Sequence, residues 1–298
     1  MKVLLEGYRV ASVLGRGAAS TVYHVVETAT GKDMALKRVI RNTKDDDKFI
    51  EQAENEFTAT HRISHPYIRH SFEIHRHREW LKLKELLLLM EYVDGHSLEA
   101  RRPSRLDTFL GIFKRVAEGL QAVHGAGLLH ADLKPQNVLW TRKGIVKVID
   151  FGQSGLIGER KNRVQGTPDF IAPEQVKKGV LDQRTDIFNL GATMYWVLTR
   201  RFFPTDLPFQ QPNDGRSAHH VHVPRVALTP RQINPKIPLA LSQLVMECCR
   251  ALPADRPPDM DVVRRRLASI QALWRKGRNA AKEKRHVADD KNRGSAVE

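Results

Sequence analysis

The strongest chemical signal in the sequence is a polar run at 130–137, His-Ala-Asp-Leu-Lys-Pro-Gln-Asn, which is soon followed by Asp-Phe-Gly. Carboxylate and amide groups between apolar strands are costly to bury unless they bind a cation or accept protons. Asn137 and Asp150 carry the hard oxygen ligands that Mg²⁺ prefers. Asp132 would then be free to accept the proton of an attacking hydroxyl. Lys134 could neutralise charge on a transferring phosphoryl group.

A glycine-containing segment at 15–22 lies between two predicted strands. Glycine lets backbone N–H groups approach phosphate oxygens with no side chain in the way. No helix follows immediately, which disfavours a dinucleotide-binding fingerprint, and the Gly-Lys-Ser/Thr sequence of a P-loop is missing. Taken alone, this segment is more typical of a turn than of a phosphate-binding loop.

Lys37 lies inside an otherwise apolar strand predicted at 34–40. A lysine on an edge strand would simply face solvent, so a functional role needs a carboxylate partner on the helix predicted at 45–63. Glu56 is the best candidate and Glu54 is the alternative. Such a pair would hold the ammonium where it meets the α- and β-phosphates of a nucleotide.

The elements that must position these residues form two groups. Up to about residue 93, β-rich runs between turn signals predict strands around a single helix, whereas helical periodicity prevails beyond Gly95. The predicted strands are 8–14, 21–26, 34–40, 86–93, 138–140 and 146–149. The predicted helices are 45–63, 106–123, 185–198, 239–251 and 260–274. A long loop is expected at 203–235, and disorder is expected beyond Trp274.

The motifs together resemble the eukaryotic-type (Hanks-type) protein kinase family, in a form closer to its bacterial members. Gly-Thr-Pro and Ala-Pro-Glu follow Asp-Phe-Gly in the family's order and spacing. Asp186 and Arg256 match two later landmarks, of which the first braces the catalytic loop and the second pairs with Glu174 of Ala-Pro-Glu. The resemblance implies an α+β, two-lobed kinase domain at 8–270. It divides into a β-rich N-lobe at about 1–93, a mainly helical C-lobe at about 94–270 and a basic, disordered tail at 275–298.

The resemblance also implies a reaction, the transfer of the γ-phosphate of Mg·ATP to Ser or Thr hydroxyls of proteins. Asp132 would be the catalytic base, and the positions of Lys134 and Thr167 match the Ser/Thr-specific branch. Met90 would be the gatekeeper, with the backbones of its neighbours bonding the adenine edge. The positions implied to bind ATP are Leu14, Gly15, Gly17, Ser20, Val22, Ala35, Lys37, Met90, Glu91, Val93 and Leu139. Those implied to act in catalysis or hold magnesium are Asp132, Lys134, Lys37, Glu56, Asn137 and Asp150.

Three departures from the family pattern stand out. Ser20 replaces the third glycine of the loop. Ala131 replaces the arginine that normally grips a phosphate on the activation loop, and no Ser, Thr or Tyr lies between Ser154 and Thr167. Because the last two departures agree, we expect this loop to order without being phosphorylated. The basic residues at 160, 161 and 163 would then pair with nearby acids.

Composition excludes several classes of protein. The net charge is +15, and residues 264–298 carry +7 of it with eleven Lys/Arg and four Asp/Glu. This tail and the basic stretch 69–84 lack interleaved aromatics for base stacking, so solvated basic faces are favoured over nucleic-acid binding.

His219, His220 and His222 are expected in a solvated loop rather than at a metal. Adjacent Cys248 and Cys249 favour reduced thiols. With no secretory signal or membrane span, a cytoplasmic protein is expected.

Two other readings of the same motifs stay open. A pseudokinase scaffold would keep the fold and dock partners without turnover, but the chain has Lys37, Asp132, Asn137 and Asp150. A small-molecule phosphotransferase would share the catalytic loop but normally lacks the Gly-Thr and Ala-Pro-Glu segment. The sequence names neither the protein substrate nor the oligomeric state.

Overall fold

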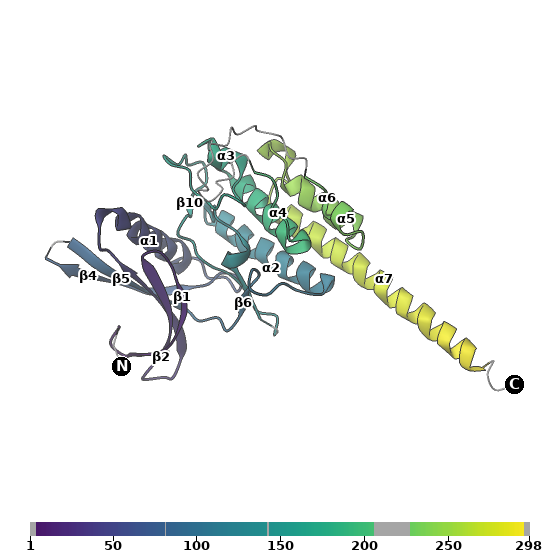
Figure 1. Cartoon of the computed structure of the whole chain (residues 1–298), viewed down its shortest axis with the longest axis horizontal. Helices are drawn as coiled ribbons and strands as arrows, with labels where there is room; N and C mark the ends of the chain where they lie inside the picture. The colour runs from purple at the N-terminus through teal and green to yellow at the C-terminus, as the bar shows by residue number, and fades with distance from the viewer. Residues whose placement is uncertain (1–3, 81, 142, 206–226, 295–298) are drawn as a thin grey trace, which may run out of the picture.

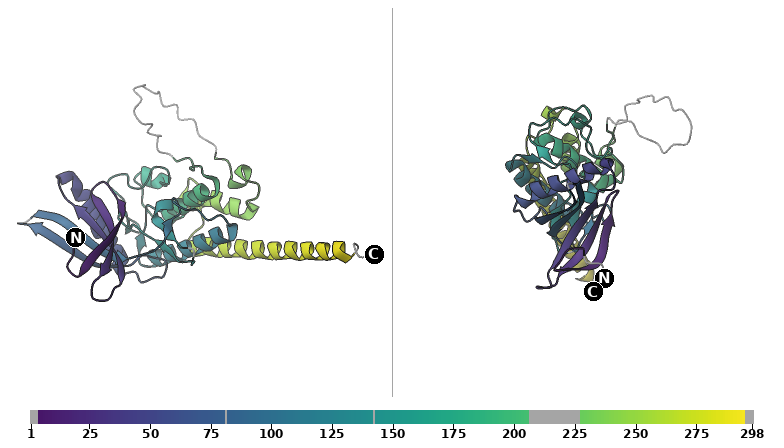
Figure 2. Two further views of the ribbon diagram at one scale, coloured as in Figure 1. Left: turned by 60° about the horizontal axis from the view of Figure 1, so that its bottom comes forward. Right: turned by 90° about the vertical axis from the view of Figure 1, so that its left-hand side faces the viewer.

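The structure is a computed structural model that describes residues 4–80, 82–141, 143–205 and 227–294, with side chains described up to residue 279. Figure 1 shows the long strands and α1 gathered at one end and most of the helices at the other. Helix α7 leaves the helical lobe as one straight element, as the left view of Figure 2 shows. The predicted two-lobed α+β architecture is therefore confirmed.

The N-terminal lobe is built on an antiparallel sheet with the strand order β1-β2-β3-β5-β4. Its strands are β1 (Tyr8–Arg16), β2 (Ser20–Glu27), β3 (Asp33–Ile40), β4 (Ser71–Glu79) and β5 (Lys82–Glu91). Helix α1 (Asp47–His61) follows a short 3-10 turn, η1 (Lys44–Asp46), and contacts β3, β4 and β5. The single long helix of this lobe thus lies against the side of the sheet formed by β3, β5 and β4.

The apolar run in β5 is buried on both faces of this sheet. Leu86, Leu88 and Met90 pack in the cluster beneath α1. Leu87 and Leu89, which alternate with them, pack on the opposite face against residues from the start of the chain. Because successive side chains of a strand point to opposite faces, a strand covered on both sides needs apolar residues at every position. This explains the continuous apolar run in the sequence.

The same alternation decides where Lys37 points. Ala35 and Val39 of β3 belong to the cluster beneath α1, and Lys37 lies between them on the same face. Its side chain is only 16% exposed. The lysine is therefore directed under the helix and does not face solvent from a sheet edge.

The C-terminal lobe consists of helices around one large apolar core. Its helices are α2 (Leu106–Gly125), α3 (Pro173–Val176), α4 (Gln183–Thr199), α5 (Pro230–Ile233), α6 (Leu239–Cys248) and α7 (Met260–Gly294), with 3-10 turns η2 (Pro135–Asn137) and η3 (Pro253–Asp255). Its short strands are β6 (His96–Ser97), β7 (Leu128–Leu129), β8 (Val138–Trp140), β9 (Val146–Val148) and β10 (Gly155–Leu156). Helix α4 is buried over almost its whole length, so it forms the centre against which α2 and α6 pack.

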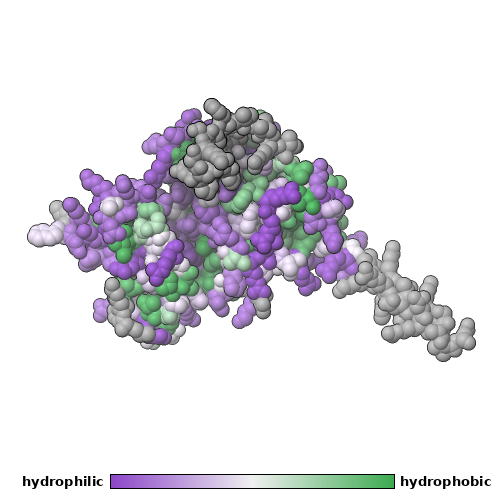
Figure 3. Space-filling model, in the orientation of Figure 1, coloured by the Kyte–Doolittle hydropathy of each residue, from purple (hydrophilic) through white to green (hydrophobic). Residues whose placement is uncertain are grey.

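The structure corrects some of the predicted elements. Strand β4 was missed because most of its residues are charged or histidine, and most of them are exposed. The β4–β5 hairpin projects from the sheet in Figure 1, and its visible surface is hydrophilic in Figure 3. The short helices α3 and α5 were also missed. Helix α5 lies inside the loop expected at 203–235. The side chain of Thr229 caps this helix by accepting a hydrogen bond from the backbone N–H of Gln232.

Some expectations fall outside what the structure describes. His219, His220 and His222 lie among residues 206–226, outside the described part of the chain. Helix α7 is longer than predicted and continues to Gly294, while the disorder expected at 275–298 stays a prediction. None of the helices in the described ranges combines the length and apolar character needed to cross a membrane.

The contact between α4 and α6 leads to a stability test. A Cβ atom added at Gly191 would lie 2.6 Å from the Cβ of Cys248 and 2.8 Å from the Sγ of Cys249. We expect Gly191→Ala to lower the free energy of unfolding by about 1–3 kcal/mol, because overpacking outweighs the gain in helix propensity. Urea unfolding measures this change. Gly277→Ala in α7, with no atom within 4 Å of the added Cβ, is the matched control and should not destabilise. Equal stability of Gly191→Ala and the unchanged chain would contradict the packing.

Candidate active site

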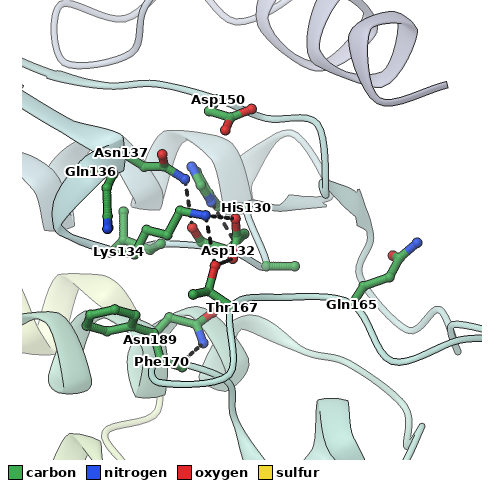
Figure 4. A network of polar contacts seen from close by, with 12 residues as sticks. His130, Asp132, Lys134, Gln136, Asn137, Asp150, Gln165, Thr167, Phe170 and Asn189 are labelled. Carbon is green, nitrogen blue, oxygen red and sulfur yellow. Dashed lines mark hydrogen bonds and ion pairs between the residues drawn. The ribbon is translucent and has the colours of Figure 1, made fainter. Parts of the chain in front are cut away.

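The carboxylate of Asp132 forms one corner of a compact polar triangle, whose other corners are Lys134 and Thr167 (Figure 4). Its Oδ2 accepts a hydrogen bond from Lys134 Nζ at 2.8 Å, and its Oδ1 accepts one from Thr167 Oγ1 at 2.8 Å. Lys134 Nζ also donates to Thr167 Oγ1 at 2.8 Å, which closes the triangle. Asp132 is 8% exposed. The arrangement brings the catalytic loop and the segment before α3 together, although they are more than thirty residues apart in the chain.

The backbone of this loop is held from below by α4. Asp186, which is fully buried, accepts hydrogen bonds from the backbone N–H groups of His130 and Ala131 at 2.9 and 2.8 Å. Ala131 has a φ of +58°, a left-handed conformation that side chains with a Cβ rarely adopt. His124 adds a contact to Asp186 at 2.8 Å. A buried anion therefore holds the turn that precedes Asp132.

His130 orients the same loop through both ring nitrogens. Its Nδ1 accepts a hydrogen bond from the backbone N–H of Asp132 at 3.2 Å, and its Nε2 lies 3.1 Å from the carbonyl of Ile149. These partners select the neutral tautomer with the proton on Nε2. The ring also packs against Phe151, with 4.5 Å between centroids. His130 thus connects the catalytic loop to the Asp-Phe-Gly motif.

Asn137 and Asp150 present oxygen atoms suited to a hard cation. The side-chain nitrogen of Asn137 donates to the carbonyl of Asp132 at 2.9 Å, which leaves its amide oxygen as an acceptor on the side where Asp150 lies (Figure 4). The Asp150 side chain is 44% exposed. Burial opposes its ionisation, but Lys37 and Lys134 nevertheless hold the pKa of this carboxyl below its usual range. The two side chains fit a magnesium site completed by water and phosphate oxygens.

Lys37 pairs with Glu56, not with Glu54. Lys37 Nζ donates to Glu56 Oε2 at 2.7 Å and lies 3.8 Å from Asp150 Oδ1. Burial alone would lower the pKa of Lys37, but Glu56 and then Asp150 raise it, so the ammonium stays charged. Glu54 instead pairs with Arg76 on the exposed side of α1.

Arg69 is a second cation on Glu56 that the sequence did not reveal. Its Nη2 donates to Glu56 Oε1 at 2.6 Å, opposite the oxygen that binds Lys37. The Glu56 side chain is 1% exposed and that of Arg69 is 12% exposed. Arg69 was expected within a solvated basic stretch, and for this residue the expectation is wrong because α1 packs directly over it. A buried carboxylate with two cations is held more firmly than one with a single partner.

The residues expected around ATP come mostly from strands of both lobes. Ala35 and Met90 are register partners in β3 and β5, and both are buried. Val22 and Leu139 are half-buried. The backbone N–H of Glu91 already donates to the carbonyl of His70 at 2.9 Å, so that N–H is not available to a purine.

The glycine loop is a tight turn between β1 and β2. The backbone N–H of Gly17 donates to the carbonyl of Ser20 at 2.7 Å. A Cβ at Gly17 would meet Ser20 Oγ at 2.8 Å, so the serine hydroxyl would have to turn away, whereas Gly15 faces open space. Leu14 is 47% exposed beside the turn. Ser20 fits this turn without disturbing its backbone.

A buried ion pair connects α3 to the residue that follows η3. Arg256 donates to both carboxylate oxygens of Glu174, at 2.7 and 2.8 Å. Its remaining donors reach backbone carbonyls at 2.7–3.1 Å, and Thr185 also donates to Glu174. Because every charge is satisfied, removing either partner would leave a buried charge uncompensated.

Ionic contacts around the segment between Ser154 and Thr167 are sparse. Lys161 lies 3.1 Å from Glu159, which belongs to the same segment. Arg163 lies 3.9 Å from Glu51 of α1, and both side chains are more than half exposed. Within the described residues Arg160 makes a backbone bridge to Val180 but no ion pair. Exposed pairs of this kind add little to stability.

Gln175, the residue after Ala-Pro-Glu, was not singled out in the sequence. It is 4% exposed, and its Nε2 donates to the carbonyls of Ala131 and Gln165 at 2.8 and 3.1 Å. It therefore bonds the catalytic loop and the segment before Thr167 at once. Its place directly after a recognised motif was the one available signal.

The comparisons with known proteins agree with this geometry. The family profile that matches is the protein kinase domain, over residues 8–267. A Clostridium perfringens protein described as "Probable serine/threonine-protein kinase" is 29% identical over 86% of this chain and 37% of its own length. Serine/threonine-protein kinase A of Synechocystis is 29% identical over 91% of this chain and 54% of its own length. The chain thus spans about half, or less, of the length of these relatives.

A solved structure shows the same fold. The PknI kinase domain of Mycobacterium tuberculosis matches with a TM-score of 0.65 and 24% sequence identity, covering 90% of this chain and 97% of that one. At this level of identity the likeness concerns the fold alone.

The buried carboxylate beneath the catalytic loop gives a prediction with a pH signature. Burial raises the pKa of Asp186, but the hydrogen bond and the charge of His124 bring it below its usual range. We expect Asp186→Asn to lower the free energy of unfolding at neutral pH by about 1–3 kcal/mol, because an amide NH₂ would face N–H donors. The folded pKa of Asp186 lies below the unfolded value of about 3.9. The ionised carboxylate therefore stabilises the folded protein above that pH, and this contribution is lost as the pH falls through the folded pKa.

Urea unfolding at neutral pH and at about pH 3 measures this difference. The gap between Asp186→Asn and the unchanged chain should narrow in acid, while the exposed Asp255→Asn should leave stability unchanged at both values. A gap that widens as pH falls would contradict the role of the ionised carboxylate.

Proposed function

Since this chain belongs to the protein kinase domain family, we propose that it transfers the γ-phosphate of ATP to serine or threonine hydroxyls of other proteins. The observation that carries the proposal is the triangle of Asp132, Lys134 and Thr167. In it a carboxylate, an ammonium and a hydroxyl of the C-terminal lobe are joined by contacts of 2.8 Å. A carboxylate in this position serves to accept a proton from an attacking hydroxyl.

The proposed reaction is an in-line displacement at phosphorus. The substrate hydroxyl oxygen bonds to the γ-phosphorus, its proton passes to an oxygen of Asp132, and the bond to the bridging oxygen of ADP breaks. Each Asp132 oxygen accepts one hydrogen bond from its neighbours, so further acceptor sites remain on the carboxylate. Lys134 lies where its ammonium can stabilise negative charge on the transferring group.

Three further groups of residues would hold the nucleotide in place. Lys37 would meet the α- and β-phosphates, with Glu56 and Arg69 fixing its position beneath α1. Asn137 and Asp150 would hold Mg²⁺, which neutralises phosphate charge when bound. Met90 and its neighbours would contact the adenine, with the carbonyl of Glu91 and the backbone of Val93 as its hydrogen-bonding groups.

The choice of Ser/Thr over other acceptors is supported by the segment before α3. Thr167 reaches Asp132 directly, so the peptide-docking segment and the proton acceptor form one unit. A small-molecule phosphotransferase has no need of this link. A pseudokinase reading is weakened because Lys37, Asp132, Asn137 and Asp150 are all present in the chain.

The first test removes the proton acceptor. We expect Asp132→Asn to lower kcat by about 10²–10⁴-fold, the usual value of general base catalysis, with little change in ATP affinity. Transfer of labelled phosphate to a mixed Ser/Thr peptide library and to casein measures the rate, and calorimetry measures Mg·ATP binding. Asp182→Asn, which keeps its cap on α4, is the matched control. Unchanged kcat in Asp132→Asn would refute the role, and ATP binding without transfer by the unchanged chain would favour the scaffold.

We further propose that the enzyme is active without phosphorylation of the segment between Ser154 and Thr167. This proposal is supported by Ala131 and by the missing hydroxyls. Phosphatase-treated protein, checked by mass spectrometry, should keep its rate within about twofold. A loss of most activity that maps to this segment would show the proposal to be wrong.

A further inference from the structure

The absence of a phosphate-gripping arginine raises the question of what holds the segment at 155–167 (the activation segment) in place. We propose that Gln175 is the positioning residue that does so, by bonding the activation segment to the catalytic loop through one uncharged amide. The inference rests on the proposed function and names the device that lets the site assemble without phosphorylation. Gln175 touches no reacting atom, so it acts through the backbone of its two partners.

The donors of this amide connect the two chain segments that form the site. Nε2 donates to the carbonyl of Ala131 at 2.8 Å and to that of Gln165 at 3.1 Å. Ala131 directly precedes Asp132, and Gln165 lies two residues before Thr167. The amide thus fixes the backbone next to both members of the 2.8 Å contact between Thr167 and Asp132.

The acceptor side of the amide fixes its orientation. Oε1 accepts hydrogen bonds from the backbone N–H of Ala172 at 3.0 Å and from Asn189 Nδ2 at 3.2 Å. With two donated and two accepted bonds, every hydrogen-bonding position of the amide is used. If the amide were rotated by half a turn, its NH₂ group would face two N–H donors and its oxygen would face two carbonyls. Since Gln175 is 4% exposed, water cannot replace these bonds cheaply.

The surroundings are shaped around this side chain. Gly166 has a φ of +120°, and a Cβ there would lie 3.2 Å from Gln175 Nε2 and 3.3 Å from Ile171 Cγ1. Glycine at this position therefore lets the backbone of the activation segment approach the amide. A cavity of about 10 Å³ remains beside Ala131 and is lined in part by Gln165, Gln175, Lys161 and Lys178. It is about the size of one water molecule, so the space that a longer side chain at 131 would need is largely filled.

The ionic alternatives are weaker on the same evidence. Lys161 is occupied by Glu159 of its own segment, and the contact of Arg163 with Glu51 is long and exposed. Neither reaches the catalytic loop. Gln175 is the described side chain that bonds the catalytic loop and the activation segment simultaneously while anchored to α4 through Asn189.

Two substitutions separate this role from a merely structural one. Gln175→Glu keeps the shape and the acceptor oxygen that caps α3 but loses both donated bonds. Gln175→Met loses all four bonds without adding charge. If Gln175 only caps α3, either substitution should lower stability alone, because it leaves buried groups unpaired, with the kcat of the folded protein and the cleavage of the activation segment unchanged. If it positions the activation segment, both variants should fail in the same way.

We expect both variants to lower kcat by at least about tenfold, with KM for ATP changed less than about threefold. Trypsin should cleave after Arg160, Lys161 and Arg163 about tenfold faster in the folded variants, because the activation segment opens more often. Cleavage after Arg266 of α7 should keep its rate, which shows that the opening is local. Gln183→Glu, which removes one exposed bond to the Pro258 carbonyl, is the matched control and should change neither readout.

The outcomes are distinct. Unchanged kcat and unchanged cleavage of the activation segment in Gln175→Glu would overturn the inference and reduce Gln175 to a helix cap. If Gln175→Met does not fold, the isosteric Gln175→Glu still decides. If the unchanged protein transfers no phosphate, the proposed function fails, while the tryptic cleavage rates still show whether Gln175 holds the segment.

Discussion

The site depends above all on one buried carboxylate. Asp186 is fully buried in the helical lobe and accepts the backbone N–H groups of His130 and Ala131. An anion is expensive to bury, and it stays there because hydrogen bonds and the neighbouring histidine compensate for the lost water. Those same bonds force the turn in which Ala131 takes a positive φ. Asp132 follows this turn directly and reaches Lys134 and Thr167 from it.

The charges around the site are balanced in pairs of short contacts. Lys37 and Arg69 share the two oxygens of Glu56, and Lys134 shares Asp132 with Thr167. The contacts of Glu56 with Lys37 and Arg69 and that of Thr167 with Asp132 join different parts of the chain, so the balance exists only when α1, the sheet and the catalytic loop are all in place. The chemistry is thereby coupled to the packing of both lobes.

The activation segment follows a different principle from the charged site. Where the family uses a phosphate and an arginine, this chain has Ala131 and no hydroxyl between Ser154 and Thr167. A neutral amide that makes four hydrogen bonds can hold two backbones together without waiting for a modifying enzyme. Salt weakens these contacts less than it weakens exposed ion pairs.

The sequence by itself determined the reaction class, because Asp132, Asn137 and Asp150 lie close along the chain and their spacing is set by local backbone geometry. It also determined the lobes, since a central strand covered on both faces must be apolar throughout and packed helices must be amphipathic. Only the tertiary structure decided between Glu54 and Glu56, placed Arg69 beneath α1 and revealed Gln175. These partners come from elements whose separation in the chain says nothing of their distance in space. A buried arginine or glutamine has the same letters as an exposed one, and what distinguishes them is the set of groups that packing brings within hydrogen-bonding reach.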